Sequence, residues 1–434
     1  MNRYRIAICA LLVSVLAFPA GAQQYTKVAV PDATTSLGIL FVGAINHAGH
    51  VAANQITGAS SSPFLWTPTG GTQFLPLPSG FVGSAYGISN NDEIVGSVNP
   101  VGGYPSAVLW TPSGGMQYLG TLTGQKGCSA FALNDAGDIA GSCGVRAFFW
   151  TPTGGMQDIG SLGGSQTGAT GINNSGMVVG SSYLPSGGIH AFVWTATGGM
   201  LDLGTLNGDS YSTATAVSDL GQVVGSSSGH AFLWSASSGM QDLGTLPGGS
   251  QSWAEGVNSK GAVVGYSFTT NGGRLNEHAF LWNSTNGMQD LNLLALGTYR
   301  NGNFGQTGAI NSSGQIVGEV VTGGGATNTE YVFSPRMTTT VSSSQNPSKV
   351  GQPVTFTATI NSIAGPPPDG EMIEFHNNGA AILGTAPLVG GTASFTTSML
   401  SVNTHTITAH YPGDENYAAT CFNCQGKVTQ IVQK

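Results

Sequence analysis

The sequence predicts an all-β protein, a seven-bladed β-propeller closed by its N-terminal strand and followed by a β-sandwich. Three observations predict this fold. Variants of a phrase of the form apolar-Asn-x-x-Gly-x-Val-Val-Gly recur seven times, their steps span 39 to 53 residues, and a different pattern follows the last copy. The copies begin at Ile45, Ile88, Leu133, Ile172, Val217, Val257 and Ile310. Such a period with several short strands per unit is typical of propeller blades, whereas the coils of a parallel β-helix, the main alternative, are shorter.

The first 22 residues are predicted to be a secretory signal peptide. Arg3 and Arg5 precede an apolar run, and Ala20-Gly21-Ala22 provides a small-residue cleavage site. No later apolar run is long enough to span a bilayer. We therefore expect a secreted bacterial protein, extracellular or associated with the cell surface, without membrane insertion.

Charged residues make up only 7% of the chain, and the formal net charge is −8. Nucleic-acid binding requires clustered Lys and Arg side chains to contact phosphates. The composition therefore argues against a nucleic-acid partner. The composition and net charge do not predict the oligomeric state.

Each repeat is predicted to contain four strands, labelled a to d. In the fourth copy these are residues 169–173, 177–181, 190–194 and 200–203. Turns rich in Asn, Ser and Gly join strands a and b, because these residues tolerate or supply the positive φ of a tight hairpin. Tyr25 to Val30 is expected to complete the seventh copy, which ends after Phe333 without a strand d of its own.

Two positions of the repeat indicate how the blades pack. A large aromatic residue in strand c is expected to fill the space between neighbouring blades. It is Trp66, Trp110, Trp150, Trp194, Trp234, Trp282 and Phe333. A small residue in strand a is expected where the innermost strands converge on the axis. It is Ala44, Gly87, Ala132, Gly171, Ala216, Gly256 and Ala309.

Three copies carry the tripeptide His-Ala-Phe in strand c, beginning at His190, His230 and His278 and followed by a hydrophobic residue and Trp. Residues 25–335 thereby resemble the bacterial extracellular HAF-repeat family. The resemblance implies an exported repeat protein and does not imply a particular activity.

The periodicity ends at Pro335, which predicts three segments: the signal peptide (1–22), the propeller (23–335) and a β-sandwich (336–434). Val354 to Ile360 alternates as a half-buried strand does. Further strands are expected at 372–375, 393–397, 404–411 and 427–432. The segment from Tyr411 to Tyr417 resembles bacterial Ig-like repeats, which implies a spacer or stalk.

The four cysteines of the mature chain form two local pairs. Cys128 and Cys143 flank the hairpin of the third copy symmetrically, so we expect them to face each other in a disulfide. Cys421 and Cys424 are expected to form a small loop disulfide, because their CxxC spacing does not precede a helix.

No catalytic, metal-binding or cofactor site is predicted. The repeat histidines occupy equivalent positions in separate blades, so they are not expected to converge on a metal ion. No Ser, His and Asp set carries a recognisable catalytic signature.

A ligand site is instead expected where loop lengths vary, in the b–c and d–a loops, which alternation of strand direction places on one face. The candidates are Trp253, Tyr211, Tyr183, Tyr104, Arg274, Tyr299 and Arg300, with Trp253 favoured as the Trp outside strand c. Aromatic faces beside polar groups suit a glycan or a protein surface.

The predicted function is a secreted, non-catalytic binding or adhesion protein. One alternative is a glycan-active lyase or hydrolase, with Asp209, Glu277 and Glu330 as loop candidates for acid–base chemistry. A carboxylate pair in the central funnel would favour this alternative. The other is a structural surface protein.

Overall fold

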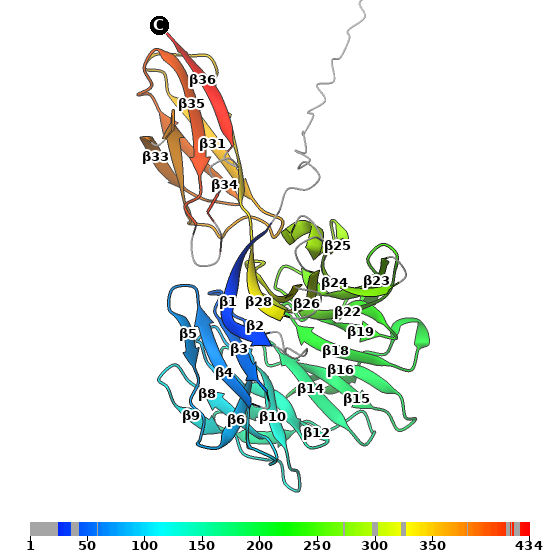
Figure 1. Cartoon of the computed structure of the whole chain (residues 1–434). Helices are drawn as coiled ribbons and strands as arrows, with labels where there is room; N and C mark the ends of the chain where they lie inside the picture. Colours follow the sequence, from blue (N-terminus) through cyan, green and yellow to red (C-terminus); the bar gives the residue numbers. More distant parts are fainter. Residues whose placement is uncertain are drawn as a thin grey trace, which may run out of the picture.

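The computed structural model describes residues 25–35, 43–58, 60–271, 274–296, 303–322, 327–379, 381–413, 417, 419–420 and 426–434. It has the all-β architecture that the sequence predicts. Within these residues, the repeat region forms seven four-stranded antiparallel sheets in a propeller-like array (Figure 1). The predicted signal peptide lies outside the described residues.

Six sheets are built from consecutive strands, and we number them in chain order. Sheet 1 contains β2 (Ala44–Ile45), β3 (Val51–Thr57), β4 (Ser60–Thr67) and β5 (Gly71–Phe74). Sheet 2 contains β6 (Phe81–Ile88), β7 (Ile94–Pro100), β8 (Ser106–Trp110) and β9 (Met116–Tyr118). Sheet 3 contains β10 (Cys128–Leu133), β11 (Ile139–Cys143), β12 (Arg146–Thr151) and β13 (Gly155–Asp158).

The next three sheets repeat this order, and two short helices follow sheets 4 and 6. Sheet 4 contains β14 (Thr167–Ile172), β15 (Val178–Tyr183), β16 (Ile189–Thr195) and β17 (Gly199–Asp202), followed by the 3-10 helix η1 (Leu206–Gly208). Sheet 5 contains β18 (Ser212–Val217), β19 (Val223–Ser227), β20 (His230–Ser235) and β21 (Gly239–Asp242). Sheet 6 contains β22 (Gly249–Val257), β23 (Val263–Asn271), β24 (Arg274–Asn283) and β25 (Gly287–Asp290), followed by the π-helix η2 (Asn292–Leu296).

Sheet 7 joins the two ends of the repeat region. It contains β26 (Asn303–Ile310), β27 (Ile316–Thr322) and β28 (Thr327–Pro335), and its fourth strand is β1 (Tyr25–Thr35). β1 pairs antiparallel with β28, with Tyr25 opposite Pro335 and Val28 opposite Val332. The N-terminal strand therefore occupies the place that the sequence predicts for the missing strand d.

The apolar cores lie between neighbouring sheets. For example, Val95 and Leu109 of sheet 2 pack with Phe148 and Trp150 of sheet 3. Val30 of β1 packs with Phe64 of sheet 1, so the N-terminal strand also joins sheets 7 and 1. The strand-c aromatic residues are buried or half-buried in these layers, which confirms their predicted packing role.

Asparagine side chains of the a–b turns connect neighbouring sheets at the axis. Asn173 accepts hydrogen bonds at Oδ1 from the backbone N–H groups of Ser175 and Met177, while its Nδ2 donates to the carbonyl of Ser218 in sheet 5. The equivalent Nδ2 of Asn311 in sheet 7 donates to the carbonyl of Asn46 in sheet 1 at 2.9 Å. The turn residue that the sequence singles out is thus also a link between sheets.

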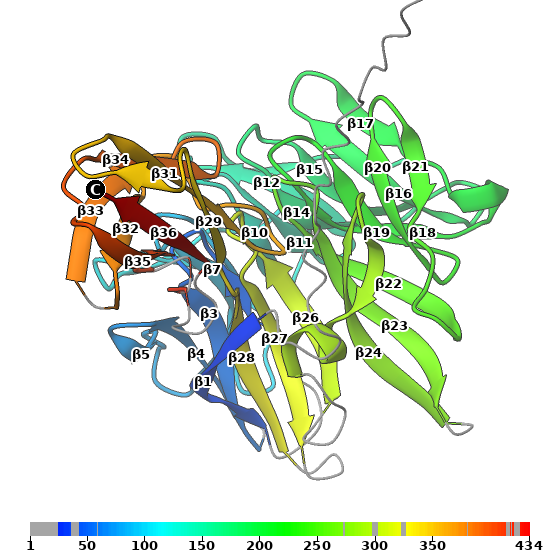
Figure 2. The same cartoon turned by 90° about the horizontal axis from the view of Figure 1, so that it is seen from above.

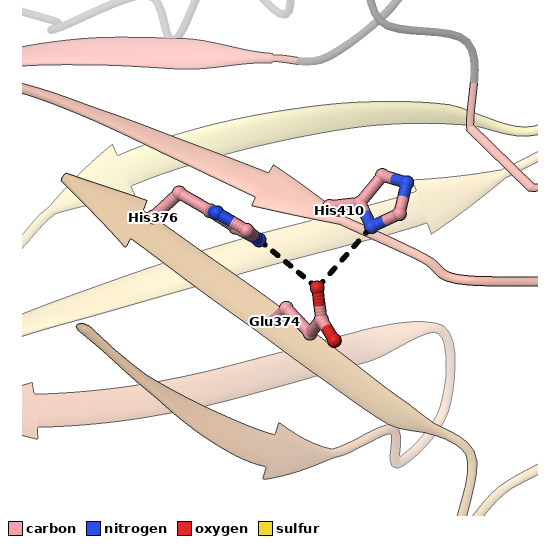
Figure 3. Close-up of side chains that lie close together, drawn as sticks. All are labelled: Glu374, His376 and His410. Carbon is pink, nitrogen blue, oxygen red and sulfur yellow. Dashed lines mark hydrogen bonds and ion pairs between the residues drawn. The ribbon is translucent and has the colours of Figure 1, made fainter. Parts of the chain in front are cut away.

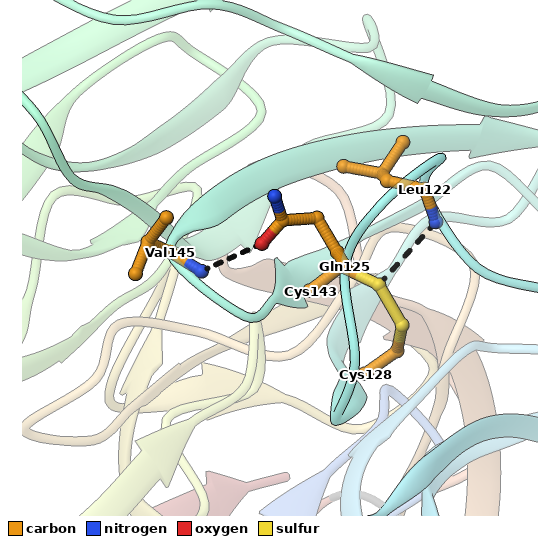
Figure 4. Close-up of a disulfide and its surroundings, with 5 residues drawn as sticks. All are labelled: Leu122, Gln125, Cys128, Cys143 and Val145. Atoms are coloured by element: carbon orange, nitrogen blue, oxygen red, sulfur yellow. Dashed lines mark hydrogen bonds between the residues drawn. A yellow bond between two sulfur atoms is a disulfide. The ribbon is translucent and has the colours of Figure 1, made fainter.

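Sheet 3 contains the predicted disulfide between Cys128 and Cys143 (Figure 4). The two residues are directly opposite each other in the β10–β11 pair, with a Cα–Cα distance of 4.0 Å. Their register follows from the symmetric placement of both cysteines about the hairpin turn. Cys421 and Cys424 lie outside the described residues, so their pairing stays a prediction.

The C-terminal unit is a sandwich of two sheets and lies beyond β1 and β28 (Figures 1 and 2). The first sheet has the order β29 (Thr338–Ser343), β31 (Val354–Asn361) and β34 (Thr392–Thr397). The second has the order β30 (Ser348–Lys349), β36 (Lys427–Gln433), β35 (Asn403–His410), β32 (Met372–Asn377) and β33 (Ala381–Pro387). The sequence analysis missed β29, β30 and β33. β33 is a mostly exposed edge strand that contains Gly and ends in Pro, so it lacks clear alternation.

Candidate functional site

A recurring β-bulge shapes the innermost strand of sheets 2 to 7. In each a–b pair, the register shifts by one residue just before the small residue of strand a. The residues left out of the pairing are Tyr86, Phe131, Thr170, Thr215, Glu255 and Gly308. A bulge bends its strand and redirects a side chain. The bulges therefore determine which side chains reach the axis.

These same residues line an axial hollow of about 310 Å³, which we call the funnel. The funnel is lined by the last three residues of the innermost strands, and the final apolar residue of each strand separates it from the a–b turns. Tyr86 and Phe131 contribute neighbouring aromatic rings with centroids 5.2 Å apart. Thr170, Thr215 and Glu255 contribute polar groups. The funnel wall thus combines aromatic and polar surface.

The small strand-a residues allow the inner strands to approach each other closely. A Cβ atom added to Gly87 would lie 2.9 Å from the carbonyl oxygen of Phe131, and one added to Gly256 would lie 3.2 Å from the Cα of Ala309. This confirms the predicted convergence on the axis. It also explains why larger side chains at the centre come from the bulges instead.

The opposite end of the axis is a polar hollow of about 200 Å³ lined by the a–b turns. Its side chains hydrogen bond mainly to one another around the ring. Asn90 donates to both carboxylate oxygens of Asp135, from its backbone N–H at 2.9 Å and from Nδ2 at 2.8 Å. Although burial alone would raise the pKa of Asp135, the hydrogen bonds from Asn90 and Asn174 lower it. At this end Asn90 and Asn174 are exposed, and their polar groups are engaged with neighbouring turns.

Four glutamates gather between sheets 6, 7 and 1 near the funnel. We call Glu255 (β22), Glu277 (β24), Glu319 (β27) and Glu330 (β28) the glutamate cluster. Glu319 and Glu330 are directly opposite each other in the β27–β28 pair. Glu330 is 1% exposed, and its Oε1 accepts a hydrogen bond from the backbone N–H of Gly43 in the segment before sheet 1.

Burial and mutual repulsion raise the pKa values of this cluster. Burial, with a contribution from the charge of Glu277, raises the pKa of Glu255 and that of Glu319 to about 7. Burial is also the main reason that the pKa of Glu330 is about 8, with Glu319 raising it further and the Gly43 hydrogen bond opposing the shift. Carboxyl groups of this kind hold protons near neutral pH.

Trp253 lies within strand β22, although the sequence analysis placed it in a loop. Its ring stacks on Tyr266 with centroids 5.2 Å apart and an interplanar angle of 18°, and it meets Phe268 edge to face. Burial, together with Glu255 and Glu277, raises the pKa of Tyr266 to about 12. The structure therefore places Trp253 in an aromatic cluster on sheet 6 beside the glutamates.

Two of the predicted ligand-binding residues meet in a second pocket on the loop face. Tyr183 and Tyr211 line a hollow of about 260 Å³ together with Val145 and Ile189. Tyr211 is 43% exposed. Tyr104 is 68% exposed in the b–c loop of sheet 2, and the Lys126 ammonium lies 5.7 Å from its ring centroid. We call the hollow formed by Tyr183 and Tyr211 the tyrosine pocket.

The remaining predicted residues are not assigned to these sites. Arg274 begins β24, and the position of its side chain is not described. Tyr299 and Arg300 lie outside the described residues. Asp209 directly follows η1, between sheets 4 and 5, whereas the glutamate cluster belongs to sheets 6 and 7.

The repeat histidines form separate hydrogen bonds with aspartates of their own sheets. His190, His230 and His278 each contact an Asp twelve residues later, at the end of strand d, with N–O distances of 2.8 to 2.9 Å. Arg146 occupies the equivalent position in sheet 3 and approaches Asp158. These residues support the c–d hairpin and do not converge.

Sequence reasoning missed Glu255 and Glu319, although the repeat contains a signal for both. Strand b reads Val-Val-Gly-Ser in sheets 4 and 5, whereas Tyr266 and Glu319 replace the Ser in sheets 6 and 7. Glu255 occupies the bulge position that holds Thr in sheets 4 and 5. Departures from the repeat therefore mark the cluster.

In the C-terminal unit, one group of described side chains has the composition and spacing of a metal site. Glu374, His376 and His410 place one ligand atom each within 4.8 Å of the others. Among the described residues, no helix is long and apolar enough to cross a membrane.

Comparison with known proteins assigns only the C-terminal unit. Residues 340–428 match the family described as bacterial Ig-like domain (group 3), so this unit contains a bacterial Ig-like domain. The sequence comparison with curated proteins found no match.

The chain has remote similarity to several solved structures. Virginiamycin B lyase from Staphylococcus aureus is 10% identical, with a TM-score of 0.48 over 71% of this chain and 98% of that one. A streptogramin B lyase is 10% identical, with a TM-score of 0.43 over the same shares. An extracellular domain from a one component system of B. thetaiotaomicron is 10% identical, with a TM-score of 0.44 over 95% of this chain and 59% of that one. At these TM-scores the similarity assigns no activity to this chain.

Proposed function

We propose that this chain is a secreted, non-catalytic binding protein whose loop face holds a glycan. In this proposal the repeat region is a seven-bladed propeller of the HAF-repeat type, closed by β1, and the Ig-like unit is a spacer. The observation that carries it is the funnel, where five of the six bulges bring an aromatic or polar side chain to one opening.

The chemistry of the funnel suits a sugar ring. Aromatic faces such as those of Tyr86 and Phe131 pack against the apolar C–H surfaces of sugars, while polar groups orient the hydroxyls. The nearby tyrosine pocket offers a second contact area on the same face. The scarcity of charge, 7% of residues, favours an uncharged polar ligand over a highly charged one.

Glycan-array binding of the mature protein, with matched variants, tests this function. Tyr86→Ala and Phe131→Ala are expected to weaken binding at least about ten-fold, which corresponds to roughly 1.4 kcal/mol. Tyr183→Ala and Tyr211→Ala are expected to have smaller effects. Tyr118→Ala is the control, because Tyr118 is 50% exposed on the outer strand β9.

Absence of glycan binding, or equal binding by the funnel variants and the wild type, contradicts the proposal. Binding to a protein extract with loss in the same variants would keep the loop face as the site but replace the glycan by a protein ligand. Trp253→Ala is expected to have little direct effect on binding, because its ring is already packed on Tyr266 and Phe268.

Acid–base catalysis on a polysaccharide is a second candidate, favoured by one specific observation. Glu255 lines the funnel with a pKa of about 7 and lies near further glutamates. A carboxyl group protonated near neutral pH can serve as a general acid. Release of new sugar ends from a polysaccharide panel tests this candidate. Activity that Glu255→Gln abolishes while binding persists would establish catalysis, and a lack of turnover on any bound glycan would reject it.

A further inference from the structure

A compact group of metal-ligating side chains lies on the outer face of the five-stranded sheet of the Ig-like unit (Figure 3). Glu374 and His376 are two residues apart on β32, so their side chains share a face. His410 on β35 is directly opposite Glu374. Their neighbours Phe375 and Ala409 point into the core, which leaves the three polar side chains half-buried at the surface.

The three side chains point at one another. His376 Nε2 lies 3.0 Å from Glu374 Oε2, and His410 Nδ1 lies 3.4 Å from the same oxygen. Both ring nitrogens therefore converge on one carboxylate oxygen.

We propose that Glu374, His376 and His410 bind a Zn²⁺ ion on the Ig-like unit. Two imidazole nitrogens and one carboxylate oxygen are a ligand set that zinc accepts, at distances of about 2.0 to 2.2 Å. Ligand atoms that already lie within 4.8 Å of one another reach such distances by small side-chain rotations. Water completes the tetrahedral coordination, since all three groups are partly exposed.

Zinc binding requires a lone pair on each coordinating ring nitrogen. Any proton that His376 Nε2 or His410 Nδ1 shares with Glu374 therefore moves to the other ring nitrogen or to solvent when Zn²⁺ binds.

The histidine–aspartate pairs of the repeat provide an internal comparison. His230 and Asp242 contact each other at 2.9 Å and are more exposed, and they offer only two ligands. A chelating site gains strongly from a third ligand, because the protein positions it in advance. Zn²⁺ binding should therefore be selective for the Ig-like unit, and this selectivity is independent of the proposed glycan binding.

Calorimetric titration of the full mature protein with Zn²⁺, without reductant, tests the proposal. We expect one high-affinity equivalent that a chelator reverses. His376→Gln, His410→Gln and Glu374→Gln should each weaken it by more than the roughly 10- to 100-fold that loss of an outer partner costs. His230→Gln should leave the affinity unchanged. Saturating Zn²⁺ should raise the Tm of the Ig-like unit by on the order of 10 °C.

A second measurement does not depend on whether the variants fold. Modification of the wild-type histidines by diethyl pyrocarbonate, mapped by mass spectrometry, should be suppressed by Zn²⁺ at His376 and His410 but not at His230. Absence of a saturable Zn²⁺ equivalent, equal affinity in the His376→Gln and His410→Gln variants, or unchanged modification of both histidines would each overturn the proposal.

Discussion

At the scale of single residues, the buried glutamates are the most unusual feature of this chain. A buried carboxylate is costly unless it is paired with a cation or takes up a proton. Glu330 has one backbone hydrogen bond, while its Oε2 has no hydrogen-bond partner. The raised pKa values of Glu255, Glu319 and Glu330 are the physical consequence.

These pKa values predict that the protein loses stability as the pH rises. From the ordinary Glu value of 4.5 to the folded value of about 8, the folded state holds more protons at Glu330 than the unfolded state does. The free energy of unfolding must therefore fall across this window, by on the order of a few kcal/mol. The effect is measured by the Tm of the protein at pH values from about 5 to about 8.5, which span most of this window.

A matched pair of variants isolates Glu330. Glu330→Gln keeps an acceptor for the Gly43 N–H and removes the ionisation, so its Tm should be higher than that of the wild type at the alkaline end and should depend less on pH. Glu93→Gln, outside the cluster, should keep the wild-type pH profile. A steeper decline of the Tm with pH in Glu330→Gln, or no decline in the wild type, would contradict the raised pKa of Glu330.

At the scale of the element, one Asn of the a–b turn combines two roles. Its Oδ1 closes the hairpin turn, and its Nδ2 connects the hairpin to the next sheet. Sheets 2 and 5 have Ser89 and Ser218 at this position, and these hydroxyls accept hydrogen bonds only within their own turns. The repeat thus contains natural variants in which the two roles are separated.

Substitutions at Asn173 can therefore measure each role. Asn173→Ser should keep the turn and lose the bond to the Ser218 carbonyl, for about 1 kcal/mol of stability. Asn173→Ala should lose both and cost roughly 1 kcal/mol more, because the partly buried N–H groups of Ser175 and Met177 lose their acceptor. Chemical denaturation of the two variants gives the comparison. Equal losses would mean that the turn role contributes nothing.

At the scale of the whole molecule, the two ends of the repeat region meet in one sheet. β1 pairs with β28, and Val30 packs against residues of sheet 1. The hydrogen bond from Asn311 to Asn46 connects the same two sheets at the axis. Sheets 7 and 1 are therefore held together by side-chain packing and by hydrogen bonding.

The Ig-like unit contacts the array through a hydrogen bond from Lys260 Nζ to the Ala364 carbonyl.

Two valines of β1 test whether this closure stabilises the whole array. Val30 is fully buried, whereas Val28 is 53% exposed in the same strand. Val30→Ala should lower the free energy of unfolding by about 2 kcal/mol, since it removes buried methyl groups and leaves a cavity. Val28→Ala should change it by less than about 0.5 kcal/mol. Equal effects in denaturant titrations would show that closure by β1 contributes little.

The sequence by itself determined the repeating four-stranded sheets, the place of β1, the packing role of the strand-c aromatic residues and the Cys128–Cys143 disulfide. Each of these depends on local turn chemistry or on the period of the repeat, which are visible in one dimension. The funnel lining was decided only by the tertiary structure, because a bulge that directs Glu255 to the axis arises from pairing and twist rather than from residue pattern.

The gathering of Glu255, Glu277, Glu319 and Glu330 is likewise a tertiary property, because sheets 6 and 7 must pack side by side to bring these side chains together. The same holds for Glu374, His376 and His410, which are 36 residues apart at their extremes and meet only through the register of β32 with β35. Register depends on which faces are buried across a whole sheet. For this reason the repeat could be predicted from the sequence, whereas the glutamate cluster and the group of Glu374, His376 and His410 could not.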